Sequence, residues 1–245
     1  MSEGRADGRA VGQGDRRQDT WPQVGQLAER LINRLIDPMV TETLTSSRDQ
    51  ILDAAEDLFA RKGLDGTTVK DIGVAAGQNP ALLYYYFGNK EELYRTVLHR
   101  VVSAMVARAG AALGTGSSPS PPDAIRALIT AQVEFLITHP RAPKLLVREM
   151  IDHDARRAEA MLLETAAGLF QRLCRVIEQG QREGLFRPGL EPRFAAVSTV
   201  AQGMYFAVAR PAIRLFFGEV VSEATGRAFA KHAGEFAVSA LAEGV

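Results

Sequence analysis

The stretch Thr67–Lys90, TTVKDIGVAAGQNPALLYYYFGNK, decides the fold of this chain. Thr68 suits the N-cap of a helix, because its hydroxyl can accept a hydrogen bond from a backbone N–H of the first turn. Gly77 provides the backbone freedom for a sharp turn. Pro80 can occupy the first position of a second helix, because the backbone N–H that proline lacks has no partner within the helix at that position. The stretch therefore predicts two short helices joined by a glycine turn, the second of them over 80–87.

Two short helices around a turn form a helix-turn-helix, in which the second helix enters the major groove of DNA. Leu83 and Phe87 are four residues apart and are expected to anchor the second helix to a core. The tyrosines at 84–86 cannot all be buried, because consecutive residues point in different directions around a helix. At least one ring should face solvent or a partner, and two interpretations stay open: contact with nucleic acid, or coverage of the domain's surface.

Residues 48–100 resemble the DNA-binding domain of the tetracycline-repressor (TetR) family of bacterial transcriptional regulators. The resemblance rests on many positions in one order: Ile51-Leu52-Asp53-Ala54-Ala55, Leu58-Phe59, Lys62-Gly63, Gly66-Thr67-Thr68-Val69, Asp71-Ile72, Ala75-Ala76-Gly77, Leu83-Tyr84-Tyr85-Tyr86-Phe87 and Lys90-Glu91-Glu92-Leu93. Two positions depart from the family pattern. Gly73 replaces the commoner alanine and should weaken the first helix by up to about 1 kcal/mol. Pro80 removes a backbone donor and bears on which operator is read.

The resemblance implies a homodimer that places two recognition helices in successive major grooves of a roughly palindromic operator. The apolar start of the second helix would face base edges and thymine methyls, the tyrosines would reach bases or phosphates, and threonine and lysine side chains would hold phosphates. DNA contacts are thereby assigned to Thr68, Lys70, Asn79, Pro80, Ala81, Leu82, Tyr84, Tyr85, Tyr86 and Lys90.

The rest of the chain is predicted to be helical, without the alternation typical of strands, so the fold class is all-α. A long helix that starts after Asn89 would connect the DNA-reading part to the remainder. The family resemblance implies that this helix couples ligand binding to DNA binding. A Gly/Ser/Pro loop over 114–122 follows it. Later helices are expected over 123–138, from Pro143 to Ile151, and over 154–184, 192–210 and 222–241.

The N-terminal 45 residues precede the family domain. Residues 1–20 are rich in Gly, Arg, Asp and Gln and are expected to be disordered. Residues 21–40 carry apolar side chains at helical spacing, which predicts an extra amphipathic helix that ends near Pro38. This helix would pack on the DNA-binding domain or on a partner subunit, or act as an arm that touches DNA. The first family helix is expected to run from about Ser47 to Lys62.

The expected organisation is therefore a tail plus extra helix over 1–45, a helix-turn-helix DNA-binding domain over 46–100, and a helical ligand-binding and dimerisation domain over 101–245. The last two long helices are rich in Ala and Gly, which allows close helix approach. In the family these helices make the homodimer; an ordinary intrachain bundle is the alternative. Plain core is the simpler interpretation for each of the candidates for a ligand cavity, which are Met105, Phe135, Met150, Phe170, Cys174, Tyr205 and Phe206.

Several function classes are disfavoured. The chain has 29 basic and 29 acidic residues, so it lacks the basic excess that advertises some nucleic-acid binders, and strong salt dependence is expected. Four histidines and one cysteine form no catalytic or metal-ligating constellation, so no enzyme, cofactor or metal is predicted. A charged cluster that could bind an anion or a metal is formed by Arg148, Glu149, Asp152, His153 and Asp154. Its spacing matches no strong metal motif, so a solvated helix end is the preferred interpretation. No membrane span is expected, since Gln202, Arg210 and Arg214 interrupt the most apolar stretch, and the predicted location is cytoplasmic.

The sequence thus predicts a ligand-responsive transcriptional regulator, most simply a repressor, whose partners are an operator DNA, a second copy of itself and an unknown small-molecule effector. The alternative is a dimeric helical small-molecule binder or scaffold without DNA function.

Overall fold

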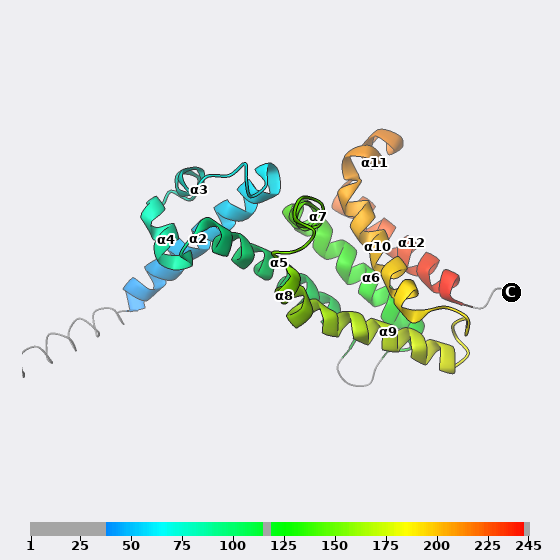
Figure 1. The fold of residues 1–245 in the computed structure, drawn as a ribbon. Helices are drawn as coiled ribbons and strands as arrows, with labels where there is room; N and C mark the ends of the chain where they lie inside the picture. The colour runs from blue at the N-terminus through cyan, green and yellow to red at the C-terminus, as the bar shows by residue number, and fades with distance from the viewer. Residues whose placement is uncertain (1–37, 115–118, 243–245) are drawn as a thin grey trace, which may run out of the picture. The chain divides into compact units, whose positions relative to one another are not determined.

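The computed structural model describes residues 38–114 and 119–242 of the chain, and all regular structure in this part is helical (Figure 1). The prediction of an all-α fold is confirmed. The elements are α2 (Pro38–Lys62), α3 (Val69–Ala76), α4 (Pro80–Phe87), α5 (Lys90–Ala112), α6 (Pro121–Thr138), α7 (Arg141–His153), α8 (Glu159–Met161), the π-helix η1 (Leu162–Ala166), α9 (Ala167–Arg182), α10 (Pro192–Val208), α11 (Arg210–Phe217) and α12 (Glu223–Leu241). Within these ranges, none of the helices has both the length and the apolar character of a membrane span.

Residues from Ser47 onward form one compact unit, which contains both hydrophobic cores of the fold. The tail over 1–20 and nearly all of the predicted helix over 21–40 lie outside the described residues. One boundary is wrong: α2 already includes Pro38, whereas a break near Pro38 and a new start near Ser47 were expected. Proline is tolerated in the first turn of a helix, and the sequence between Val40 and Lys62 contains no glycine or proline that would interrupt it.

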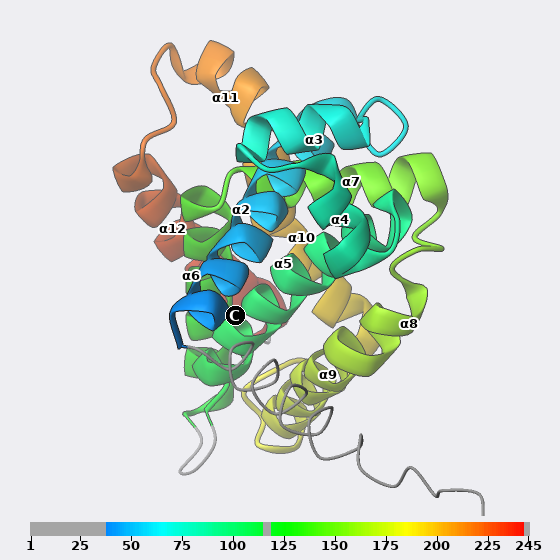
Figure 2. The same ribbon diagram turned by 90° about the vertical axis from the view of Figure 1, so that its left-hand side faces the viewer.

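A first core holds the DNA-reading part together. It combines Phe59 of α2, Ile72 of α3, Leu83 of α4 and Tyr94 of α5, all buried. Phe59 and Tyr94 meet edge to face, with ring centroids 5.0 Å apart. Figure 2 shows α4 beside both α3 and α5, with which it packs. The same core continues into α6 and α7, so the recognition region and the helices behind it share one hydrophobic cluster.

A second core joins α6, α9, α10 and α12 with the end of α5, and Figure 1 shows α6, α10 and α12 side by side. The approach of α12 to α6 depends on glycine at position 226, where a Cβ would overlap the Cδ1 atom of Ile137. A Cβ on Gly234 would lie 3.4 Å from the Cα of Arg126, which is an ordinary contact distance. Phe206 and Phe229 stack between α10 and α12, with centroids 3.9 Å apart. This part is therefore a closely packed helical bundle.

The expected long helix over 154–184 is wrong. Asp154 and Ala155 both adopt left-handed backbone conformations, with φ of 51° and 57°, and turn the chain after α7. The helical part after this turn consists of the short α8, the π-helix η1 and then α9. A left-handed conformation costs a non-glycine residue roughly 1–2 kcal/mol, and periodicity in the sequence gives no sign of it.

The expected helix over 192–210 is also divided, into α10 and α11. Pro211 has no N–H to donate to the carbonyl of Ala207, and its ring would clash with that carbonyl, so α10 ends at Val208 and a new helix starts at Arg210. Both views show α11 projecting from the end of α10. Its Leu215 and Phe216 are exposed. The predicted start of the next helix at Pro143 is a smaller error, since α7 begins two residues earlier at Arg141.

Most of the small residues on the last helices serve the chain's own bundle. Ala196, Gly203, Ala230, Ala233 and Ala237 are buried within the subunit. The intrachain alternative therefore accounts for them, while the exposed face of these helices has a different composition: Phe194, Val197, Tyr205 and Phe236.

Candidate nucleic-acid interface

The turn before α3 is built as the sequence predicts. The Thr68 hydroxyl accepts a hydrogen bond from the backbone N–H of Asp71 at 3.1 Å, and the Asp71 carboxylate accepts one from the N–H of Thr68 at 3.2 Å. This reciprocal capping box satisfies two donors that the helix itself cannot use. Hydrogen bonding from Thr68 lowers the pKa of Asp71, with a smaller contribution from the charge of Lys62. At the other end Gly77 is left-handed with φ of 63°, as expected for the turn.

The start of α4 has a simpler side-chain cap. The Asn79 side chain accepts a hydrogen bond from the N–H of Ala81 at 2.9 Å, and Pro80 occupies the first helical position. Leu83 and Phe87 are buried and anchor the helix, which confirms that prediction. Arg48 of α2 lies over the Phe87 ring, with its guanidinium carbon 5.3 Å from the centroid. The short helix is therefore fixed at its N-terminus by a cap and along one side by the core.

The opposite side of α4 is free. Tyr84 and Tyr85 are 55% and 74% exposed, so the prediction that at least one tyrosine faces outward is confirmed. Asn79, Pro80 and Ala81 are exposed as well, and Leu82 is half-buried. We call this set, Asn79–Ala81 with Tyr84 and Tyr85, the α4 face. It presents apolar surface, an amide and two phenol groups from a single rigid helix.

Tyr86 is not part of the α4 face. Its hydroxyl oxygen is buried and has no hydrogen-bond partner among the described residues, and its ring meets Tyr85 and Phe87 edge to face at 5.1 Å and 6.1 Å. The sequence carried a signal for this position, because Leu83, Tyr86 and Phe87 share one side of a helix at spacings of three and four. A contact between the Tyr86 hydroxyl and DNA would require the ring to leave this site.

Lys90 has a structural role that the sequence did not predict. Its ammonium group donates hydrogen bonds to the carbonyl oxygens of Leu64 at 2.8 Å and Thr67 at 2.9 Å. The Thr67 hydroxyl in turn donates to the carbonyl of Gly63 at 2.7 Å. The first residue of α5 therefore fastens the loop between α2 and α3. Because an ammonium group has three hydrogens, one is left for a phosphate. Lys70 is exposed on α3.

Ion pairs connect helix α5 to helix α2. Arg100 of α5 donates to Asp53 at 2.7 Å and to Glu56 at 2.6 Å. Although burial opposes the charged form, these hydrogen bonds raise the pKa of Arg100. Gln78, in the turn between α3 and α4, donates to the side chain of Gln50 of α2 at 2.6 Å. The linking helix and the recognition turn are therefore both tied to α2.

The predicted ligand-lining residues divide between the two cores and the surface. Met105 and Phe135 belong to the first core, and Phe170, Cys174 and Phe206 to the second. Met150 and Tyr205 are exposed. Phe135 stacks on His139 and borders a cavity of about 290 Å³ near Arg100. For most of this set the structure supports the interpretation as plain core.

The charged run at the end of α7 is a solvated helix end only in part, because Asp152 and Asp154 are exposed but Glu149 is buried. Glu149 is 2% exposed and accepts a hydrogen bond from the N–H of Arg157 at 2.9 Å. It faces Tyr94, whose pKa is raised by burial and then by the charge of Glu149. Arg148 instead reaches the last turn of α2, where it donates to the carbonyl of Arg61 at 3.1 Å. Sequence spacing alone could not show this, because the partners lie far apart in the chain.

Comparison with known proteins agrees with this architecture. Residues 51–97 match the family described as "Bacterial regulatory proteins, tetR family", and residues 121–236 match the "Tetracyclin repressor-like, C-terminal domain". The transcriptional repressor NicS of Pseudomonas putida is 31% identical over 142 residues, which cover 58% of this chain and 66% of NicS. The repressor KstR2 of Mycolicibacterium smegmatis is 29% identical over 147 residues, or 60% of this chain and 70% of KstR2.

Solved structures show the same fold. The ketosteroid transcriptional regulator KstR2 of Mycobacterium tuberculosis aligns with a TM-score of 0.64 at 22% identity, covering 80% of this chain and 95% of that one. A regulatory protein of the family from Rhodococcus RHA1 aligns with a TM-score of 0.68 at 20% identity, covering 80% and 97%. The two family matches span the recognition helices and the bundle behind them, and the chain belongs to the TetR family of bacterial transcriptional regulators.

Proposed function

We propose that this chain is a repressor that binds a palindromic DNA site as a homodimer and is released from it by a small-molecule effector. The α4 face carries the proposal. A short helix, capped by Asn79 and anchored by Leu83 and Phe87, exposes Tyr84 and Tyr85 on its free side. A rigid helix with exposed apolar and hydrogen-bonding groups suits readout of base edges in a major groove.

In this proposal the residues divide their roles by chemistry. Pro80 and Ala81 contact base edges and thymine methyls, and Tyr84 and Tyr85 donate hydrogen bonds to bases or phosphates. Lys70, the remaining hydrogen of Lys90 and the hydroxyl hydrogen of Thr68 hold phosphates. The oxygen of that hydroxyl accepts the cap hydrogen bond from the N–H of Asp71, which leaves its hydrogen free to donate. Leu82 contributes apolar surface at the edge of the contact. Residues 46–100 would be the DNA-binding part and residues 101–245 the sensing and dimerising part.

A homodimer is supported by the exposed apolar face of α10 and α12. Phe194, Val197 and Tyr205 recur on one side of α10, and Phe236 is exposed on α12. An exposed apolar patch of this kind is typical of a protein–protein interface. One short recognition helix reads few bases, and a dimer would place two of them about 34 Å apart, one turn of DNA. Repression is the activity that the names of NicS and KstR2 state for those relatives.

The proposal is tested by capturing sheared chromosomal DNA with the purified protein and sequencing what is enriched. We expect one or a few palindromic sites. In a gel-shift titration on such a site, Tyr84→Ala should lose about tenfold to a hundredfold in affinity, in line with roughly 1–3 kcal/mol for a specific contact, and remain dimeric.

The control is Ile151→Ala, which removes an exposed apolar side chain from α7. It should bind the site as tightly as the wild type. Absence of any enriched site over a range of salt concentrations would favour the binder or scaffold alternative, and full affinity of Tyr84→Ala would remove α4 as the reading helix.

A further inference from the structure

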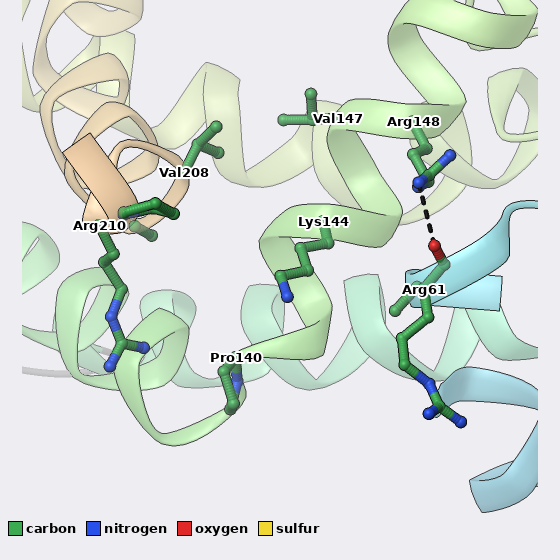
Figure 3. A pocket seen from close by; sticks show the side chains of 10 residues that line it. Arg61, Pro140, Lys144, Val147, Arg148, Val208 and Arg210 are labelled. Carbon is green, nitrogen blue, oxygen red and sulfur yellow. Dashed lines mark hydrogen bonds between the residues drawn. The ribbon is translucent and has the colours of Figure 1, made fainter. Parts of the chain in front are cut away.

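A cavity of about 730 Å³ lies where the last turn of α2, the outer side of α7 and the junction of α10 with α11 meet (Figure 3). Its volume is within the range of small-molecule sites. None of the residues predicted to line a ligand site borders it. It is lined by Ala60, Arg61, Pro140, Lys144, Val147, Arg148, Ala207, Val208, Arg210 and Pro211.

The charged residues of this lining are all cations: Arg61, Lys144, Arg148 and Arg210. Figure 3 shows Lys144 between Arg210 on one side and Arg148 with Arg61 on the other. Arg61 is paired with Asp57, and Arg148 lies 3.8 Å from Asp152. Within the described ranges, Arg210 has only the neutral carbonyl of Val221 as acceptor, at 3.0 Å, and Lys144 has no acceptor at all. The cavity therefore holds more positive charge than its surroundings neutralise.

The remaining lining is apolar, with Ala60, Val147, Ala207 and Val208 among its members. Cations beside apolar walls fit a ligand that carries an anionic group on an apolar body, because the walls favour burial of the body and the cations favour the charge. We propose that this cavity binds a small organic anion, a carboxylate or phosphate ester, and that this anion is the effector. Its role as effector rests on the proposed repressor function, whereas its binding rests on the cavity itself.

The cavity also contains the contact through which binding can reach the DNA-reading part. Arg148 donates to the carbonyl of Arg61 in the last turn of α2, where the helix dipole favours a cation. An anion at Lys144 and Arg210 competes for the Arg148 guanidinium, since a carboxylate or phosphate is a stronger acceptor than a carbonyl. Release of Arg148 frees the end of α2. The next loop, held by Lys90 at Leu64 and Thr67, leads directly into α3.

Binding is tested on the full chain by calorimetry with octanoate and phenyl phosphate as anionic probes, and with octanamide as the uncharged match of octanoate. We expect octanoate or phenyl phosphate to bind saturably and octanamide to bind at least tenfold more weakly. Lys144→Gln should weaken the anion about tenfold, as expected when one charge-assisted hydrogen bond worth roughly 1.4 kcal/mol is lost. Lys144 has no acceptor to lose in the described part of the chain, so this variant should fold normally.

The double variant Lys144→Gln/Arg210→Gln should abolish the preference for the anion over the amide. Arg175→Gln, which removes an exposed cation from α9, is the control and should bind as the wild type does. The assignment is overturned if both anions bind more weakly than about 1 mM, or if Lys144→Gln and Arg175→Gln bind alike.

Coupling is tested with Arg148→Gln in the same gel-shift titration on the captured DNA site. We expect the bound anion to lower the DNA affinity of the wild type and to leave that of Arg148→Gln unchanged. An equal response in both proteins would overturn the role of Arg148. The two proposals fail separately: a chain that binds the site but no anion refutes the cavity alone, and a chain that binds the anion but no DNA refutes the repressor alone.

Discussion

Pro80 fills the space that a side chain at Gly73 would need. An ideal Cβ on Gly73 would lie 2.9 Å from the Cγ of Pro80 and 3.0 Å from the carbonyl oxygen of Gln78. Both residues are departures from the family pattern, and the structure shows that they belong together. Glycine in α3 lets the ring that opens α4 pack against it, so the local cost of glycine in a helix is offset by this contact.

Gly73→Ala is therefore expected to destabilise the protein, although alanine is the better helix former by about 1 kcal/mol. Overpacking against a ring and a backbone carbonyl should cost roughly 1–3 kcal/mol, because neither can move aside easily. The double variant Gly73→Ala/Pro80→Ala should recover the part of the loss that the ring causes, while the contact with the carbonyl of Gln78 remains. Urea denaturation of the wild type, both single variants and the double variant measures the coupling between the two positions.

Gly168→Ala is the matched control, because a Cβ on Gly168 in α9 would meet nothing within 4 Å. It should unfold at the same urea concentration as the wild type or a higher one. A simple sum of the two single effects in the double variant would contradict the pairing of Gly73 with Pro80.

Lys90 is expected to contribute to both folding stability and DNA binding, whereas Lys70 is expected to contribute to DNA binding alone. Lys90→Met removes the donor for two backbone carbonyls and should lower the free energy of unfolding by about 2 kcal/mol, as well as weaken DNA binding. Lys70→Gln should leave unfolding unchanged and reduce the slope of log affinity against log salt by about one for each recognition helix. Equal stability of Lys90→Met and the wild type in urea would show that the hydrogen bonds from Lys90 contribute little.

Tyr86→Phe is expected to be neutral or stabilising. Its hydroxyl is buried without a partner among the described residues, and an unsatisfied buried polar group costs about 1–3 kcal/mol. DNA affinity should be unchanged, in contrast to Tyr84→Phe, which removes an exposed hydroxyl from the α4 face. Thermal denaturation and the gel shift together separate the two roles. Weaker DNA binding by Tyr86→Phe would mean that the ring turns outward on the operator.

The pH dependence of alkylation at Cys174, the single cysteine of the chain, tests the environment of its thiol. Burial, and then the charge of Glu178, raise the pKa of the Cys174 thiol. Since the thiolate is the reactive form, less of it is present at a given pH, and alkylation by iodoacetamide should be slow at neutral pH and continue to accelerate above the ordinary thiol range near about 8.5. The protein in urea is the reference. Coincident pH profiles of the folded and unfolded protein, followed by mass spectrometry, would contradict the shift.

The helices around the α4 face could be predicted because their ends are set locally. Thr68, Gly77, Asn79 and Pro80 each act within a few residues of themselves, so the sequence contains the whole signal. The anchoring of α4 by Leu83 and Phe87 followed from spacing in the same way. The inward orientation of Tyr86 could also have been predicted, because Tyr86 follows Leu83 by three residues and so shares its side of the helix.

The rest depended on partners far apart in the chain. Spacing showed that the last helices carry small residues, but not whether α6 or a second subunit covers them. The cations of the cavity come from α2, α7 and α11, and no local pattern joins them. The backbone at Asp154 and Ala155 is held by its surroundings, so the helical periodicity of the sequence continues through it unchanged. The fold class could therefore be predicted from the sequence, whereas the cavity could not, because it is formed by tertiary contacts between distant helices.

The contact between α6 and α12 limits where this protein can move. Ile137 sits in a notch that only glycine at 226 leaves open, and Arg126 lies against Gly234 further along the same helix. The side chain of Ile137 in this notch opposes sliding of α12 along α6, because a shift would press it against neighbouring residues of a closely packed interface. We expect this pair to behave as the stationary part of the subunit when an effector binds.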